Sequence, residues 1–478
     1  MEGVYKAPLF PKNSGTEDKW ITFKGMEGHE VIIEGGYEVI DWKVHKGNIY
    51  VADWESSWLG AEWATDSWGG SNGFVNVDNG LGAEYWPKPA VDESGFSAGV
   101  EYMEENSWTY DKEKQKLYLW MADNANPNNH EIFAAKSHFR SHQGIYIHGN
   151  YGNRYVKYEN FKIRLCYRGI NIDPTGSEQI KLRDIEAYNV HTGVLNNKVN
   201  KYITMDNIYI HHTNGPGIQN NGNYSTMNNI KVHDTGIVEW ARWAGPGVIL
   251  MGNNNILKNS EIYNTAYTGA YLETWGTEGE GGRDRSHHNI VENCVIHNIP
   301  GAHAIVFSGA DDCVARSNII YDCPSGGIRV SKGGHGGETT AEQRKALNNE
   351  IYNNTIVESG YVGIRIRENS FYTKIFNNIV YESQHHLYVD ANTEYESDYN
   401  CFFSNSELNI RIGDNRYSSL SDYNDRSNQG ENSFYQDPKF TNIEENDFTL
   451  QAASPCINNG TILDGIGYEN APNIGAEQ

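Results

Sequence analysis

Acidic side chains on neighbouring repeats of this sequence are the residues best suited to catalysis. Glu273 ends the segment GAYLE, and Asp311 and Asp312 follow the corresponding segment AIVFS of the next repeat. Two carboxyl groups about 5–10 Å apart, one of them protonated, can cleave a glycosidic bond. We therefore predict that Glu273 is the acid and that Asp311 or Asp312 is the base or nucleophile. Because the chain is rich in acidic residues, a surface position without a catalytic role is the alternative.

Two arginines occupy equivalent positions in successive repeats. Arg329 lies in GIRVS and Arg365 lies in GIRIR. Like charges about 5 Å apart repel each other unless an anion lies near them. Glu273, Glu368 or the aspartates are one possible source of that anion, which would make the arginines part of a structural ion-pair network. A carboxylate or sulfate of a substrate is the other, since guanidinium groups bind such anions bidentately.

Other polar and aromatic residues are expected beside these. The predicted substrate-binding residues are Glu239, Arg242, Trp243, Tyr271, Trp275, Arg329, Lys332, His335, Arg365 and Arg367. The candidate proton carriers are His287, His288, His303 and His335. Ca²⁺ is an alternative ligand of the acidic residues, although the sequence has no contiguous calcium loop. No zinc motif is found either, so no cofactor is assigned.

A repeat of about 24 residues positions all of these side chains. Gly169, Gly193 and Gly217 are separated by 24 residues each, and every one precedes a branched apolar residue. A second series places one polar residue before a short β-branched run. Its members are Asn207, Asn229, Asn259, Asn293, Ser317, Asn354 and Asn377. Short alternating strands without intervening amphipathic helices predict a right-handed parallel β-helix, with these asparagines stacked in left-handed turns.

Three coils of this repeat are longer than the others and carry insertions. The inserted segments are 236–246, 277–288 and 332–344, and each flanks a strand that follows the repeated glycine. Loops on a solenoid gather on its working face. Side chains alternate along a strand, so Ala270 and Leu272 should point inward while Tyr271 and Glu273 point outward. We therefore predict one groove, with these strands as its floor.

Composition limits the classes of molecule that the protein is expected to bind. The chain has 478 residues and a formal net charge of −24, which argues against binding nucleic acid. It has no apolar run of membrane length. We expect a secreted or periplasmic protein, a monomer or small homo-oligomer, that binds a polysaccharide or oligosaccharide. The six cysteines follow no metal spacing and are expected to be buried thiols. The abrupt start in a first coil suggests that an upstream segment was removed.

The regular and irregular stretches of the repeat divide the chain into four predicted regions. The predicted regions are a first coil at 1–36, an inserted β-rich module at 37–140, the β-helix core at 141–405, and C-terminal coils with a cap at 406–478.

The motifs resemble those of right-handed parallel β-helix enzymes that act on polysaccharides, the pectate-lyase-like superfamily. The likeness rests on the GIxI and NNxI strands, the closing segments SPCINNG and NIGAE, and the early inserted module. This module is similar to one in β-helix glycoside hydrolases of the xylosidase and fucosidase type. The resemblance covers nearly the whole chain, and it implies the fold and a carbohydrate substrate. The catalytic motifs of polygalacturonases, of DPHD epimerases and of Asn-Lys-Ser lyases are absent in this sequence, so no catalytic residue carries over.

Three functions remain open from the sequence. A glycoside hydrolase acting on an anionic plant or algal polysaccharide would use Glu273 with Asp311 or Asp312. A polysaccharide lyase would neutralise a uronate with arginine or Ca²⁺ and abstract a proton with Lys332, an arginine or a histidine. A non-catalytic glycan-binding β-helix would use the groove for binding alone.

Overall fold

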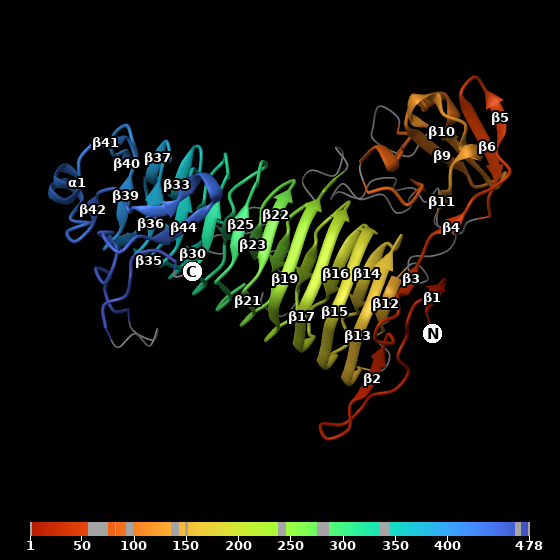
Figure 1. Ribbon diagram of the computed structural model, residues 1–478, viewed down its shortest axis with the longest axis horizontal. Coiled ribbons are helices and arrows are strands. Elements are labelled where there is room, and N and C mark those ends of the chain that lie inside the picture. The colour runs from red at the N-terminus through yellow and green to blue at the C-terminus, as the bar shows by residue number, and fades with distance from the viewer. Residues whose placement is uncertain are drawn as a thin grey trace. The chain divides into compact units, whose positions relative to one another are not determined.

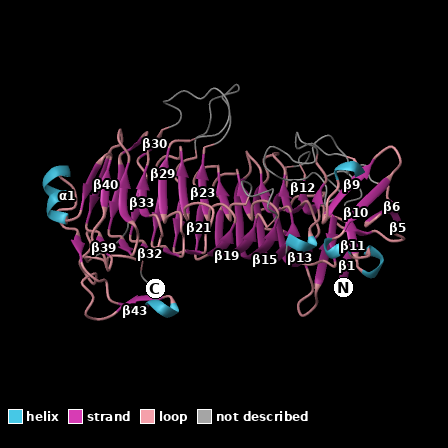
Figure 2. Ribbon diagram, turned by 90° about the horizontal axis from the view of Figure 1, so that it is seen from above, coloured by secondary structure: helices cyan, strands magenta, loops and turns pink. Residues whose placement is uncertain are grey.

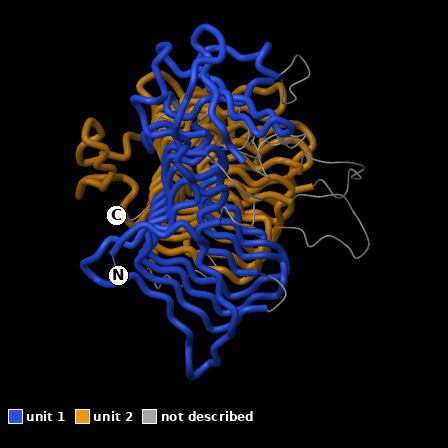
Figure 3. The backbone as a smooth tube through the Cα atoms, turned by 90° about the vertical axis from the view of Figure 1, so that its right-hand side faces the viewer, with its two compact units in different colours: residues 1–221, 231–246 blue, residues 222–230, 247–478 orange. Residues whose placement is uncertain are grey.

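The computed structural model of the protein describes residues 2–55, 75–81, 83–91, 99–134, 143–148, 152–237, 245–274, 286–333, 345–463 and 470–476. The chain forms two compact units, residues 1–221 with 231–246, and residues 222–230 with 247–478 (Figure 3). Strand β19 (Thr226–Thr235) is divided between them. Both units contain coils of parallel strands, as the repeat predicted.

The first unit begins with β-helix coils whose strands pair in parallel (Figure 1). These strands are β1 (Gly3–Tyr5), β2 (Ile21–Lys24), β3 (Val31–Glu34), β12 (Gln143–Ile147), β13 (Arg154–Arg164), β14 (Arg168–Ile172), β15 (Glu178–Val190), β16 (Thr192–Asn196), β17 (Lys201–Thr213) and β18 (Ile218–Asn220). The glycine-led strands β12, β14, β16 and β18 form one ladder. The long strands β13, β15 and β17 form another.

Two small sheets lie in the segment predicted as an inserted module. Their strands are β4 (Tyr37–Glu38), β5 (Lys43–Lys46), β6 (Ile49–Asp53), β7 (Val75–Val77), β8 (Lys88–Pro89), β9 (Ser107–Asp111), β10 (Lys116–Trp120) and β11 (Ile132–Ala134). Short 3₁₀ helices accompany them at Ala83–Tyr85, Val100–Tyr102, Ala122–Asn124 and Pro127–Asn129. The sheets share a core of their own, to which Trp42, Trp54, Trp86 and Trp108 contribute large buried side chains. Tryptophans therefore fill this region where Ile and Val fill the coils.

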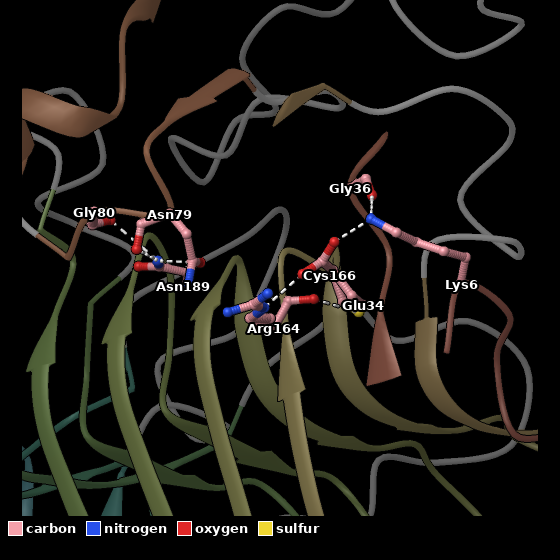
Figure 4. A network of polar contacts seen from close by, with 8 residues as sticks. All are labelled: Lys6, Glu34, Gly36, Asn79, Gly80, Arg164, Cys166 and Asn189. Atoms are coloured by element: carbon pink, nitrogen blue, oxygen red, sulfur yellow. Dashed lines mark hydrogen bonds and ion pairs between the residues drawn. The ribbon is translucent and has the colours of Figure 1, made fainter. Parts of the chain in front are cut away.

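A buried carboxylate joins the first strands to the coils that follow the inserted segment (Figure 4). Glu34 is 2% exposed and accepts hydrogen bonds from Lys6 Nζ and from Arg164 Nε. Lys6 Nζ also donates to the carbonyl oxygen of Gly36 at 2.8 Å. Nearby, Asn189 Nδ2 donates to the carbonyl oxygen of Asn79 at 3.0 Å. Lys6 and Arg164 therefore compensate the cost of burying the Glu34 carboxylate. An unpaired carboxylate buried at this position would destabilise the fold.

Most coils of the second unit have three short strands, and β30 (Ala346–Leu347) and β34 (Ser370–Phe371) add a fourth strand to two of them. Its strands are β20 (Val248–Leu250), β21 (Ile256–Lys258), β22 (Glu261–Thr265), β23 (Ala270–Glu273), β24 (Ile290–Glu292), β25 (Val295–His297), β26 (Ile305–Ser308), β27 (Val314–Arg316), β28 (Ile319–Tyr321), β29 (Ile328–Ser331), β30 (Ala346–Leu347), β31 (Glu350–Tyr352), β32 (Thr355–Val357), β33 (Val362–Ile366), β34 (Ser370–Phe371), β35 (Thr373–Phe376), β36 (Ile379–Tyr381), β37 (His385–Val389), β38 (Tyr395–Asp398), β39 (Cys401–Phe403), β40 (Ile410–Ile412), β41 (Asn415–Tyr417), β42 (Phe434–Tyr435), β43 (Phe440–Asn442) and β44 (Asp447–Leu450). Its helices are α1 (Leu420–Ser427) and a 3₁₀ helix at Ile443–Glu445. Figure 2 shows how completely strands dominate the coils.

Strands β20, β23, β26, β29, β33, β37 and β40 form the glycine-led ladder of the second unit. The glycines are required by close approach between coils. A Cβ at Gly327 would lie 2.6 Å from the carbonyl oxygen of Gly363, and one at Gly269 would lie 2.8 Å from that of Ala304. The predicted inward residues, among them Leu272, are fully buried; Tyr271 and Val306, predicted to point outward, are buried too, in a separate cluster with Ile249.

Asparagines stack between coils in two columns. One asparagine was assigned to the wrong column from the sequence. Asn377 and most of its predicted series have positive φ, as expected, but Asn353 rather than Asn354 has it in its coil. Asn354 belongs to a buried ladder, where its Nδ2 donates to Asn378 Oδ1 at 3.0 Å and Asn378 Nδ2 donates to Asn400 Oδ1 at 3.0 Å. The adjacent pair Asn353-Asn354 made the two columns indistinguishable in sequence.

The C-terminal segment packs along one side of several successive coils. Phe440, Phe448, Cys456 and Ile474 share a buried cluster with side chains of the β32, β36 and β39 strands. All six cysteines are free and buried, as predicted. Among the helices of the described residues, none has the length and apolar character needed to cross a membrane.

Candidate functional site

The glycine-led ladder of the second unit presents two columns of outward side chains. In the first column Tyr271 pairs with Val306, Val306 with Arg329, and Arg329 with Arg365. In the second column Glu273 pairs with Ser308, and Ser308 with Ser331. Glu273 and Arg365 therefore lie on the same side of the ladder. Each coil rises about 4.8 Å, so the Arg329 position is about 10 Å and the Arg365 position about 14 Å from the Tyr271 position.

Glu273 is the most strongly perturbed carboxyl group on this face. Its side chain is 2% exposed, and the Tyr271 hydroxyl donates to Glu273 Oε1 at 3.1 Å. Burial raises the pKa of Glu273 to about 7, because removal from water disfavours the charged form, while the bond from Tyr271 opposes the shift. Burial, and then the nearby carboxylate, also raises the pKa of Tyr271. A carboxyl group with this pKa is largely protonated below pH 7.

The two stacked arginines each retain an unsatisfied donor. Within the described residues, Arg329 Nε and Arg365 Nε are buried without a hydrogen-bond partner. Arg365 Nη2 donates to Asp390 Oδ1 at 3.1 Å, and its guanidinium lies 4.3 Å from the ring centre of Tyr388. Arg367 Nε lies 3.7 Å from Asp390 Oδ2. One aspartate therefore serves two arginines, and no pairing between Arg329 and an acid is seen in the described part of the chain.

His303 adds a neutral group to this cationic region. Its side chain is 7% exposed, and in the described residues neither ring nitrogen has a hydrogen-bond partner. Burial lowers the pKa of His303 to about 3, and the positive charges of Arg329, Arg365 and Arg367 act in the same direction. Gly326 leaves room for the ring, since a Cβ there would lie 2.6 Å from His303 Cδ2. An anion beside these arginines would offset their part of this shift, whereas the larger effect of burial would remain.

The two predicted aspartates lie in the turn that follows β26. Asp311 Oδ1 accepts a hydrogen bond from the backbone N–H of Leu347 at 2.9 Å. Asp312 has a φ of 51°, and its Oδ1 accepts from Asn348 Nδ2 at 3.1 Å. Both carboxylates thus contact the next coil. Asp311 follows Ser308, the coil partner of Glu273, by three residues, which span at most about 11 Å.

Of the remaining predicted binding residues, the structure describes Lys332 but not five others. Lys332 pairs with Glu368, so this acid serves the lysine rather than the arginine column. Five predicted residues lie outside the described parts of the chain: Glu239, Arg242, Trp243, Trp275 and His335. Asp390 and Tyr388 were missed, although they occupy the next coil after Arg365. In that coil His386 stands at the glycine position, so the glycine spacing gave no signal.

Residues 143–344 match the family described as the right handed beta helix region. This chain is a right-handed parallel β-helix protein. A search of curated proteins gives no match to the sequence.

Solved structures with some likeness are carbohydrate-related proteins of low identity. The xylose complex of XylC has 12% identity and a TM-score of 0.49, with 92% of this chain and 81% of that chain covered. A glycoside hydrolase has 13% identity and a TM-score of 0.40, with 86% of each chain covered. Pectate lyase Pel9A has 14% identity and a TM-score of 0.36, with 70% and 79% covered. Likeness at this level carries no activity from those proteins to this β-helix.

Proposed function

We propose that this β-helix protein is a glycoside hydrolase that acts on an anionic polysaccharide or oligosaccharide. The observation that carries the proposal is the pairing of a buried, proton-holding Glu273 with a column of arginines on the same ladder face. Arg365 and Arg367 share Asp390 as their acidic partner, and Arg329 adds a third positive charge to this face. In a chain with net charge −24, such a local excess of positive charge favours an anionic ligand.

In the proposed reaction Glu273 donates its proton to the departing glycosidic oxygen as the bond from the anomeric carbon breaks. Asp311 or Asp312 supplies the second carboxylate, which activates water or attacks the anomeric carbon. The hydrogen bond from the Leu347 N–H orients Asp311 for this role. The arginines hold a carboxylate or sulfate of the substrate through bidentate bonds.

A polysaccharide lyase is the second candidate, and His303 is the observation that favours it. When a uronate carboxylate lies against Arg329 and Arg365, it offsets their charge, which acts together with burial to lower the pKa of His303. His303 then abstracts the proton next to that carboxylate, and the leaving oxygen departs with formation of a carbon–carbon double bond. This route needs arginines and a base in contact with the same sugar.

A product assay on a panel of polyuronates, sulfated and neutral glycans tests the proposal. Hydrolysis yields new reducing ends without ultraviolet absorbance, whereas elimination yields an absorbing unsaturated end. Glu273→Gln should abolish the first reaction, and His303→Asn should abolish the second. Glycan binding without turnover by the unmodified chain would contradict both and favour a binding protein.

A further inference from the structure

Two histidines and an aspartate, none of them among the predicted site residues, meet on successive coils of the first unit. His212 ends β17 and Asp234 lies in β19, and both have a φ of 51°. In the preceding coil Asn189 occupies this left-handed position, which Asn adopts readily. His212 and Asp234 thus replace the ordinary turn residue in two adjacent coils, with His233 beside them.

The donor atoms of these three side chains are spaced for one metal ion. One ligand atom from each lies within 4.8 Å of the other two. His233 Nδ1 is 2.6 Å from Asp234 Oδ2, and His212 Nε2 is 3.7 Å from that same oxygen. Ligand atoms placed about 2.0–2.1 Å from a tetrahedral Zn²⁺ are about 3.4 Å apart. One of the two distances above is shorter than this separation and the other is longer.

Neighbouring side chains orient both imidazoles for ligation. Tyr209 hydroxyl contacts His233 Nε2 at 2.8 Å, leaving Nδ1 directed at Asp234. His211 Nδ1 contacts His212 Nδ1 at 2.8 Å, leaving Nε2 directed at Asp234, and His211 Nε2 contacts Glu186 at 3.2 Å. Hydrogen bonds of this kind to the second ring nitrogen fix the tautomer of metal-binding histidines.

The tautomers required by this network are mutually consistent. With the ion bound, His212 would donate from Nδ1 to His211, His211 from Nε2 to Glu186, and His233 from Nε2 to Tyr209. The two ligating nitrogens would then carry lone pairs. Glu186 and Tyr209 also line a cavity of about 450 Å³ in the same unit.

We propose that His212, His233 and Asp234 bind a divalent transition-metal ion of the Zn²⁺ class. Two imidazole nitrogens and one carboxylate suit such an ion, whereas Ca²⁺ prefers oxygen ligands alone. Three protein ligands leave the fourth position open for water. The ion ties the β17 coil to the β19 coil at a point where a turn asparagine is missing. This site is independent of the proposed glycosidase activity.

Titration of the chelator-treated full chain with Zn²⁺, followed by calorimetry, tests this site. We expect one Zn²⁺ per chain, and loss of binding in His212→Asn and Asp234→Asn. Asparagine keeps the left-handed turn, so these variants should fold. Tyr209→Phe should weaken Zn²⁺ binding by about 10–100-fold. Asp322→Asn is the matched control, because Asp322 also has a left-handed φ, of 52°, but lies in the other unit.

Substitution of Co²⁺ gives a second readout that needs no variant. A four-coordinate site of nitrogen and oxygen ligands should give intense visible absorption bands, and Zn²⁺ should displace them. Absence of Zn²⁺ binding by the unmodified chain would overturn the proposal. Unchanged stoichiometry and affinity in Asp234→Asn would overturn it as well. In that case His233 and Asp234 form a hydrogen-bonded pair only.

Discussion

Replacement of Glu273 by Gln should change how the stability of the protein depends on pH. The unfolded chain ionises this carboxyl group near pH 4.5, whereas burial in the folded protein raises its pKa to about 7. Between these values the folded state holds a proton that the unfolded state releases. The free energy of unfolding contributed by Glu273 therefore falls as pH rises from about 4.5 to about 7.

The size of the effect follows from the two pKa values. One pKa unit corresponds to about 1.4 kcal/mol, so the difference between 4.5 and about 7 amounts to about 3 kcal/mol. The amide of Glu273→Gln is isosteric and does not ionise. Relative to the unmodified protein, the variant should gain about 3 kcal/mol between pH 4 and pH 8.5. Most of that gain should appear below pH 7.5.

Urea unfolding of the unmodified protein and of Glu273→Gln at pH 4 and pH 8.5 measures this change in relative stability. Because both proteins carry the same other titrating groups, the contributions of those groups cancel in the comparison. Glu396→Gln, at an exposed position of β38, is the control for loss of one carboxyl group. An equal stability difference between Glu273→Gln and the unmodified protein at both pH values would refute the reasoning. Glu273 would then not be held protonated, and it would lose its place as the general acid.

Three further outcomes are expected. In the pH profile of kcat/KM, activity should fall as pH rises through about 7, because the acid Glu273 must be protonated to act; a flat profile from pH 6 to pH 9 would contradict this. Arg365→Gln should raise KM for an anionic glycan by at least about 10-fold with a smaller change in kcat, because a charge-assisted bond is lost; equal loss on neutral glycans would argue against a role in binding charge. Asn378→Ala should lower the free energy of unfolding by about 3 kcal/mol in urea titrations, since it strands buried donors and acceptors of Asn354 and Asn400; a loss below about 1 kcal/mol would show that the asparagine ladder contributes little.

The fold was predictable because the repeat determines both the close contacts between coils and the side chains that fill the interior. Glycines recur where a Cβ would collide with the next coil, and apolar residues alternate where side chains fill the interior. The coil register followed directly, and Arg329 does pair with Arg365 as predicted. The Asn353-Asn354 error arose because a one-residue slip moves a side chain into another column.

The surroundings of the candidate site were less predictable, since they depend on contacts between residues far apart in sequence. Asp390, the partner of Arg365, lies in a coil whose glycine is replaced by His386. His303 was named only as one of several histidines, because its burial against Gly326 is invisible in the sequence. The His212 and Asp234 pair escaped a search for zinc motifs because its members come from different coils.

Turnover by Glu273→Gln tests the central claim most directly. On whichever glycan the unmodified protein cleaves, the account predicts new reducing ends without ultraviolet absorbance. It also predicts a rate lowered by about 10²–10⁴-fold in the variant, with unchanged circular dichroism. Near-normal turnover by the folded variant would contradict the account, and so would an ultraviolet-absorbing product from the unmodified protein.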